Sequence, residues 1–165
     1  MKKIFKLLFA LVLTTALLTA CGETAEEVKR EVSDNFVTFV ATADWEVTGE
    51  TNTRIKLEKV DTDEFMQPEI LFGLESTLSP QEQIDQWLNI YSDGKQVKDM
   101  TINGITYLVV ERDTGTGKYI HMCTSPGSKL EKDARGAVTI EILRTTMEEV
   151  KPILATVSIK DPEEK

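Results

Sequence analysis

The stretch SPQEQIDQWLNIYSDG, residues 79–94, decides the fold, because it carries the clearest helix signal in the chain. Ser79 is a favoured N-cap residue, proline follows at the first helical position, and Glu82 completes a capping box. An apolar stripe then follows at helical spacing through Ile84, Trp87, Leu88 and Tyr91. Gly94 is expected at the C′ position. This pattern predicts an amphipathic helix over about residues 80–92, which lies on a sheet.

Four segments before this helix have the composition of β-strands, with β-branched and aromatic residues between turn residues. They are residues 36–40, 45–47, 54–60 and 69–75. The third segment alternates, with Ile55 and Leu57 on one face and charged side chains on the other. This is the pattern of a half-buried strand in an antiparallel sheet. Residues 49–53 are expected to form a loop.

Three more strands are expected after the helix, at residues 96–102, 105–112 and 118–124. Asn103-Gly104 favours a type I′ hairpin between the first two of them. The run Leu108-Val109-Val110 is apolar at successive positions. A strand that is apolar on both faces is usually central and covered on both sides.

The C-terminal part predicts one further strand and one further helix. Residues 137–143 alternate as a strand, after a polar loop at 125–136. Over residues 145–159, a helical stripe runs through Val150, Ile153, Leu154 and Val157. Proline is tolerated in the first turn of a helix, so Pro152 places the start of this helix near Glu149.

The first 21 residues have the pattern of an export signal. Lys2, Lys3 and Lys6 precede an apolar run over residues 7–18, which is too short for a bilayer span of about 20 residues. Leu18-Thr19-Ala20-Cys21 follows and resembles the lipobox of bacterial lipoproteins. The resemblance implies cleavage before Cys21, diacylation of its sulfur, and stable anchoring by two or more acyl chains. An ordinary secretory signal with an accidental cysteine is the alternative.

The sequence therefore predicts a signal peptide at residues 1–20 and a lipidated N-terminus with a tether at 21–35. Within this tether, Thr24-Ala25-Glu26-Glu27 fits a capping box and Val28 and Val32 follow at helical spacing, which favours a short helix. A single α+β domain is expected over residues 36–160, with a charged C-terminal tail at 161–165.

Composition excludes several classes of partner. Cleavage leaves 165 − 20 = 145 residues, enough for one domain with one core, and removal of three lysines changes the formal charge from −9 to −12. An acidic surface argues against nucleic acid, which selects basic patches. Because Cys21 is expected to carry lipid, Cys123 is the sole remaining thiol and no intramolecular disulfide is expected.

The order of the expected elements resembles that of the PsbP-like superfamily over roughly residues 36–159, with Trp45 after the first strand and Asn103-Gly104 in mid-chain. The resemblance implies an α/β/α sandwich, in which an antiparallel β-sheet is flanked by helices. Members of that superfamily include accessory subunits, transport adaptors and envelope lipoproteins. No functional residue is transferred, because a shared fold does not carry a shared task.

Candidate catalytic motifs are weak. His121 and Cys123 share one face of a strand about 6–7 Å apart, which is not the contact that a nucleophile and its base need. Asp113-Thr114-Gly115 matches the aspartic-protease tripeptide but lies among turn residues. The acidic segment 61–64 lacks the glycine of a calcium loop. The aromatic residues are expected mainly in the core: Trp45, Phe72, Trp87 and Tyr107.

The sequence thus predicts a non-catalytic, lipid-anchored binding or accessory module at the outer face of a bacterial membrane, without a cofactor, metal or nucleic-acid partner. Its partner is expected to be an envelope protein, which requires an exposed apolar patch. One alternative is a carrier of a small apolar or lipid-like ligand in an apolar sheet–helix cleft. A second is a hydrolase with an unrecognised carboxylate site, which requires converging ionisable groups.

Overall fold

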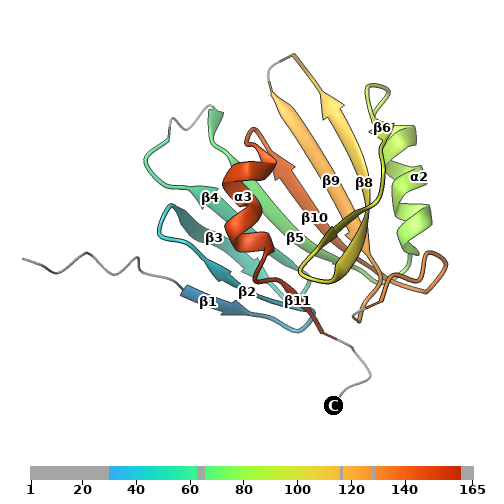
Figure 1. The fold of residues 1–165 in the computed structure, drawn as a ribbon, viewed down its shortest axis with the longest axis horizontal. Coiled ribbons are helices and arrows are strands. Elements are labelled where there is room, and N and C mark those ends of the chain that lie inside the picture. Colours follow the sequence, from blue (N-terminus) through green and yellow to red (C-terminus); the bar gives the residue numbers. More distant parts are fainter. Residues whose placement is uncertain (1–29, 63–65, 116, 128, 161–165) are drawn as a thin grey trace, which may run out of the picture.

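The computed structural model describes residues 30–62, 66–115, 117–127 and 129–160 (Figure 1). Cys21, the predicted signal peptide and the C-terminal tail lie outside these residues. The described chain has an α+β fold, with two antiparallel sheets and two helices. Neither of these two helices is long and apolar enough to cross a bilayer.

The larger sheet has eight strands in the described residues, in the order β3-β4-β5-β10-β9-β8-β6, with β7 paired to β8. Its strands are β3 (Trp45–Thr51), β4 (Arg54–Lys59), β5 (Glu69–Glu75), β6 (Lys95–Gln96), β7 (Met100–Ile102), β8 (Ile105–Asp113), β9 (Lys118–Thr124) and β10 (Ala137–Leu143). All strand pairs of this sheet among the described residues are antiparallel, as the sequence pattern predicts.

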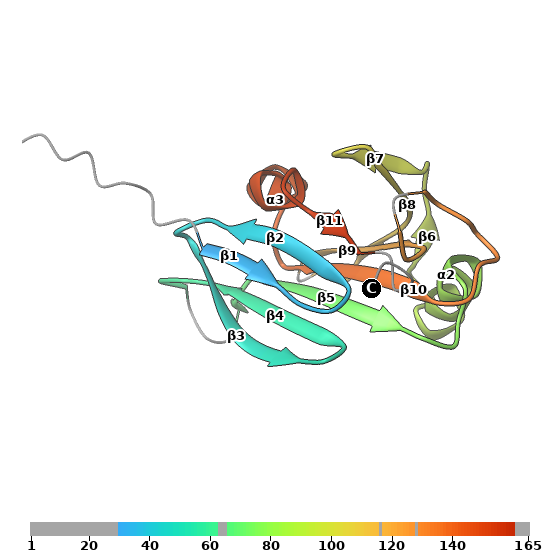
Figure 2. The same ribbon diagram turned by 90° about the horizontal axis from the view of Figure 1, so that it is seen from below.

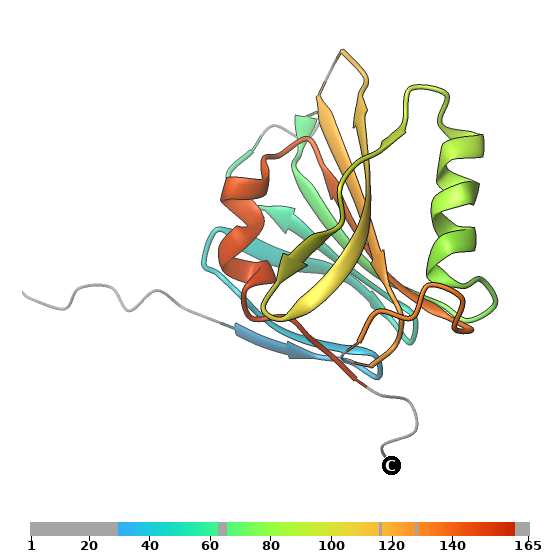
Figure 3. The same cartoon turned by 45° about the vertical axis from the view of Figure 1, so that its right-hand side comes forward.

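The two faces of the larger sheet are covered differently (Figures 2 and 3). Helix α2 (Pro80–Ile90) packs on one face, over β8 and β9. On the other face lie helix α3 (Met147–Leu154) and a small sheet of β1 (Arg30–Ser33), β2 (Val37–Ala41) and β11 (Ser158–Ile159). This second face holds the main hydrophobic core.

Several predicted elements are confirmed. Strands β5 and β10 have the predicted bounds, and the capping box of α2 is present, with Ser79 accepting from the Glu82 N–H and Glu82 accepting from the Ser79 N–H. Asn103 and Gly104 both have positive φ angles, of 50° and 78°, as a type I′ turn requires. Strand β8 is buried on both faces.

The N-terminal predictions need two corrections. The predicted helix through Val32 is wrong in its described part, because residues 30–33 form strand β1, which pairs with β2 and buries Val32 against the core. The predicted loop at 49–53 is also wrong, since β3 continues to Thr51 after a register shift at Gly49. In both segments the structure is determined by pairing with another strand, which the local spacing of apolar residues does not indicate.

The second helix also starts earlier than predicted. Thr146 caps it and Glu149 completes a capping box, so α3 begins at Met147 and Pro152 lies inside it. Pro152 is exposed, so the carbonyl left without its helical N–H partner can bind water. Val157 lies beyond the helix and leads into β11, a strand that local pattern does not indicate.

Gly94 is not the C′ residue of α2. The helix ends at Tyr91, which has an extended conformation, and Gly94 has no positive φ angle. A Cβ atom at Gly94 would lie 3.0 Å from the Tyr91 carbonyl oxygen and 3.3 Å from Val110 Cγ1. Close packing of the loop on β8, and not a left-handed cap, is the reason for glycine here.

Candidate functional site

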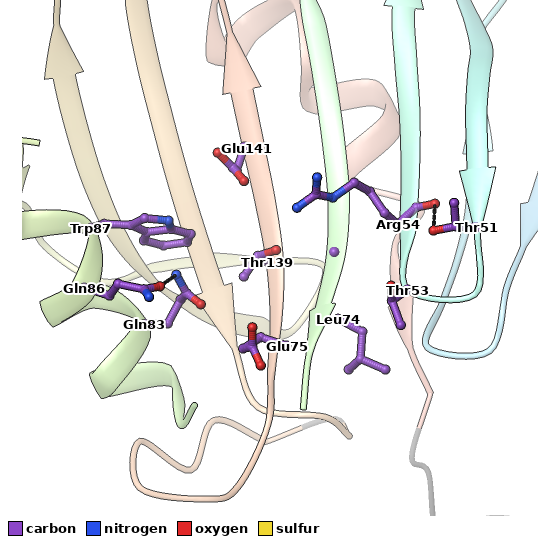
Figure 4. A pocket seen from close by; sticks show the side chains of 11 residues that line it. Thr51, Thr53, Arg54, Leu74, Glu75, Gln83, Gln86, Trp87, Thr139 and Glu141 are labelled. Atoms are coloured by element: carbon purple, nitrogen blue, oxygen red, sulfur yellow. Dashed lines mark hydrogen bonds between the residues drawn. The ribbon is translucent and has the colours of Figure 1, made fainter. Parts of the chain in front are cut away.

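A groove of about 540 Å³ lies between α2 and the face of the larger sheet that α2 covers only in part (Figure 4). Helix α2 contributes Gln83, Gln86 and Trp87 to its lining, and the sheet contributes Arg54, Thr139 and Glu141. The lining is mostly polar, whereas the opposite face of the same strands is hydrophobic. We call this cavity the α2 groove.

Strand alternation creates the α2 groove. In β10, Val138, Ile140 and Ile142 enter the main core, so Thr139 and Glu141 must point to the other face. Helix α2 covers that face only over its hydrophobic part, formed by Leu108, Val110 and Cys123. The polar outward positions of β10, β5 and β4 therefore stay open beside the helix.

Glu141 is held from beneath by a buried histidine. His121 Nδ1 lies 3.1 Å from Glu141 Oε2, with the ring N–H donating to the carboxylate. The His121 side chain is 2% exposed and that of Glu141 is 24% exposed, so the carboxylate still reaches the groove. The buried Nε2 atom of His121 has no hydrogen-bond partner among the described residues.

The His121 ring is itself held by aromatic neighbours. The ring centroids of Trp87 and Tyr91 lie 5.1 Å and 5.2 Å from that of His121. The Arg112 guanidinium lies 3.7 Å from the Tyr91 ring centroid and forms an ion pair with Asp93 at 3.1 Å. The groove residues Trp87 and Glu141 are thus both held in place by contacts with the buried His121 ring.

Arg54 brings a cation into the groove. Its side chain extends across β5 toward Glu141 (Figure 4), and within the described residues it forms no ion pair and no side-chain hydrogen bond. The other carboxylate in the lining, Glu75, accepts hydrogen bonds from the Thr77 hydroxyl and N–H at 2.7 and 2.9 Å. These bonds lower the pKa of Glu75. Arg54 is therefore the cation of the lining, and Glu141 and Glu75 are its two carboxylates, each with one oxygen in a hydrogen bond to the protein.

Gly73 forms part of the groove wall between Arg54 and Thr139, which are its partners in the neighbouring strands. A Cβ atom at Gly73 would lie 2.5 Å from Thr139 Oγ1. Glycine inside a strand often marks a close approach, and here it leaves space for the threonine side chain and for the groove.

The two glutamates of the groove do not converge. Glu141 pairs with Leu71 and Glu75 with Ala137, so they lie four residues apart along the strands, about 13 Å. Figure 4 shows them on either side of Thr139. A glycosidase-type pair needs carboxyl groups about 5–9.5 Å apart. The register of Glu141 and Glu75 therefore does not match such a pair.

His121 and Cys123 share the face that α2 covers, as predicted, but they do not form a reactive pair. Cys123 Sγ donates to the Pro80 carbonyl oxygen at 3.3 Å, and burial raises the pKa of the Cys123 thiol to about 12. The His121 ring is hydrogen-bonded to Glu141 instead. The thiol therefore stays protonated in the core.

The two remaining sequence motifs are the tripeptide 113–115 and the acidic segment 61–64. Asp113 Oδ1 accepts from the Gly115 N–H at 3.1 Å in the β8–β9 hairpin, so the tripeptide 113–115 belongs to a turn, as expected. Of the acidic segment 61–64, residues 63 and 64 lie outside the described residues. Within the described part, no group of three or more His, Cys, Asp or Glu side chains could hold a metal ion.

The four aromatic residues expected mainly in the core are all buried, and one of them also lines the groove. Trp45, Phe72 and Tyr107 are buried in the main core, where Phe72 stacks on Phe39 with centroids 4.3 Å apart. Trp87 is 5% exposed and lines the groove.

A second cavity, of about 690 Å³, lies between the turn end of the β8–β9 hairpin and the start of α3. Its apolar lining comes from Val97, Tyr119, Ile120 and Met147. Exposed large hydrophobic side chains in the described part of the chain are Met66, in the β4–β5 connection, and Ile90, at the end of α2. These two lie on separate elements and do not build the broad patch of a protein-docking surface.

Comparison with known proteins defines no family. No family model matches this sequence, and no curated protein matches it. A solved structure from Bacteroides thetaiotaomicron VPI-5482 is similar to this chain, with 11% identity and a TM-score of 0.47. The match covers 84% of this chain and 51% of that one, so this chain spans about half the length of that protein.

Proposed function

We propose that this chain is a lipid-anchored, extracytoplasmic binding module that holds a small polar ligand in the α2 groove and performs no covalent step. The observation that carries the proposal is the groove itself: polar side chains from α2 and four strands line it, with Arg54 and Glu141 available to a ligand. The separation of its carboxylates and the buried thiol support a non-catalytic role. A PsbP-like α/β/α architecture is part of the proposal, supported by the placement of α2 and α3 on opposite faces of the sheet.

The anchor is tested by Cys21→Ala in the producing cell. We expect this variant to lose palmitate labelling and to leave the membrane fraction, because thioether acylation needs the cysteine sulfur. Cys123→Ala is the matched control and should be labelled and retained like the wild type. Normal labelling of the Cys21→Ala chain would contradict the anchor.

The groove is tested on lipidated protein extracted from its own membranes. Small molecules released on unfolding are compared by mass spectrometry between wild type, Arg54→Ala and the control Arg30→Ala, whose exposed side chain lies on β1. We expect a polar molecule that wild type and Arg30→Ala retain and Arg54→Ala loses. The same released material from all three proteins would contradict a site at the groove.

A carrier of an apolar ligand is the second candidate, and the cavity near α3 favours it through its apolar lining. Met147→Asp would place a charge in that lining, and burial of an unpaired charge opposes apolar binding. Loss of a co-purified lipid from Met147→Asp, with nothing lost from Arg54→Ala, would favour this carrier over the polar-ligand module.

A further inference from the structure

We propose that the ligand of the α2 groove is a neutral saccharide, bound through its hydroxyl groups by Arg54, Glu141 and the glutamine amides, with Trp87 at one side. This inference rests on the proposed function and names the chemical class that the site selects. A volume of about 540 Å³ is within the range of small-molecule sites.

The charge of the groove disfavours an anionic ligand. The lining has one cation, Arg54, and two carboxylates, Glu141 and Glu75, of which Glu75 accepts two hydrogen bonds from Thr77 through Oε1. Arg54 aligns with Gly73 and Thr139 across the sheet, and Glu141 is two residues further along β10, so the two Cα atoms are about 12 Å apart. An anionic ligand would be attracted by one end of this span and repelled by the other.

The mixture of donors and acceptors favours hydroxyl groups. A guanidinium only donates, an ionised carboxylate only accepts, and glutamine amides and threonine hydroxyls do both. A sugar hydroxyl can accept a hydrogen bond from Arg54 and donate one to Glu141. Hydroxyl groups can therefore bond both charged side chains. The Gln83 amide already donates to Gln86 Oε1 at 3.2 Å, which leaves further donors at this edge (Figure 4).

The aromatic wall completes the match to a sugar. Trp87 contributes an apolar surface beside polar groups, and a pyranose ring has an apolar C–H face with hydroxyl groups around its rim. A purely apolar ligand would leave Arg54 and Glu141 desolvated without partners, which is unfavourable. A small zwitterion would engage the two charges and leave the amides and the indole unused.

The Glu141 carboxylate is set for this task by its hydrogen bond to His121. The bond uses Oε2 and leaves Oε1 available to accept a hydrogen bond from a ligand. Because the His121 ring is packed between Trp87 and Tyr91, the carboxylate and the indole are placed by the same buried ring.

The experiment uses the detergent-solubilised full chain with Trp45→Phe, which leaves Trp87 as the sole tryptophan. Trp87 fluorescence is followed during titration with cellobiose, maltose and chitobiose, and in parallel with glutamine and glycine betaine. We expect saturable binding of at least one of the sugars, with Kd on the order of 1 mM or tighter. Side-chain amide signals of Gln83 and Gln86 in wild-type NMR spectra should shift with the same sugar, which gives a readout independent of the Trp45→Phe change.

Glu141→Gln and Arg54→Ala should each weaken sugar binding by about tenfold or more, because each removes a charged hydrogen bond. Glu148→Gln and Arg30→Ala, exposed on α3 and β1, are the controls and should bind like the parent. Binding of glutamine or betaine that depends on Arg54 and Glu141 would overturn the saccharide class and leave the proposed function standing. The absence of a sugar response in both readouts would also overturn it, while release of a polar molecule in the Arg54→Ala comparison decides the proposed function separately.

Discussion

His121 Nδ1 lies 3.1 Å from Glu141 Oε2, so a fully buried ring on β9 orients a carboxylate at the rim of the α2 groove. His121→Phe should keep the ring stack and change the free energy of unfolding by no more than about 1 kcal/mol, since Glu141 can turn to water. His121→Ala should cost about 2–4 kcal/mol, because it leaves a cavity under α2. Urea denaturation of both variants checks this. Equal losses would show that the hydrogen bond, and not the ring packing, holds the helix.

Gly73→Ala should destabilise the domain by about 1–3 kcal/mol, because the added Cβ would lie 2.5 Å from Thr139 Oγ1. Thr139→Ala removes that oxygen, so the double variant should recover most of the loss in a double-mutant cycle. Gly49→Ala is the control, since its Cβ would meet Lys56 Cβ at an ordinary 3.6 Å. Additive losses at 73 and 139 would refute the proposed clash.

Ser79→Ala should cost about 1 kcal/mol, because the Glu82 N–H loses its side-chain acceptor at the start of α2. Ser79→Asp supplies another good N-cap oxygen and should stay close to wild type. Chemical denaturation measures both. A loss of equal size in the two variants would mean that the cap is not the source of the effect.

The capping glutamate of α3, Glu149, should make the free energy of unfolding depend on pH in the acidic range. Hydrogen bonds from Lys59, Thr145 and the Thr146 N–H lower the pKa of Glu149 from 4.5 to about 2. A depressed pKa in the folded state stabilises the protein above pH 4.5, and this contribution disappears as the pH falls toward 2. The stability difference between wild type and Glu149→Gln should therefore be largest above pH 4.5 and vanish near pH 2.

Denaturation of the two proteins across this pH range measures that difference. Glu148→Gln, at the neighbouring exposed position, is the control and should follow the wild-type pH profile. A wild-type to Glu149→Gln difference that stays constant from pH 6 to about pH 2 would contradict the assignment.

Cys123 should resist thiol reagents in the native protein. Burial raises the pKa of its thiol to about 12, and only the thiolate is a strong nucleophile. In the Cys21→Ala chain, where Cys123 is the sole thiol, modification by a disulfide reagent at pH 8 should follow global unfolding. Fast labelling of the folded chain would show that the β9–α2 contact opens locally.

Local pattern predicts the elements whose own residues decide their structure. The α2 cap, the alternation of β5 and β10 and the Asn103-Gly104 turn are all of this kind. Strand β11 has two residues and forms only through pairing with β2, more than a hundred positions earlier, so no local signal indicates it. Pro152 inside α3 misleads for a related reason, because the Thr146–Glu149 cap outweighs a single lost hydrogen bond at the surface.

The sequence does not indicate the groove, because its polar residues alternate with apolar ones in the same way as on a solvent-exposed strand face. Thr139 and Glu141 alternate with core residues in the way that any half-exposed strand requires. Gly73, in the middle of an alternating strand, is the one local sign of a close approach. The pairing of Glu141 with His121 needs the β9–β10 register, which brings together residues twenty positions apart.

If Cys21 carries the lipid anchor proposed above, the early start of β1 limits the distance between the domain and the bilayer. Strand β1 begins at Arg30, 30 − 21 = 9 residues after Cys21, and nine extended residues span about 30 Å at most. With its acyl chains inserted as proposed, the protein would be a binding module held close to the membrane surface by a short tether. Figures 1 and 2 show α2 on the side of the molecule opposite the start of β1, so in the proposed anchoring α2 lies away from the point where the tether joins the domain.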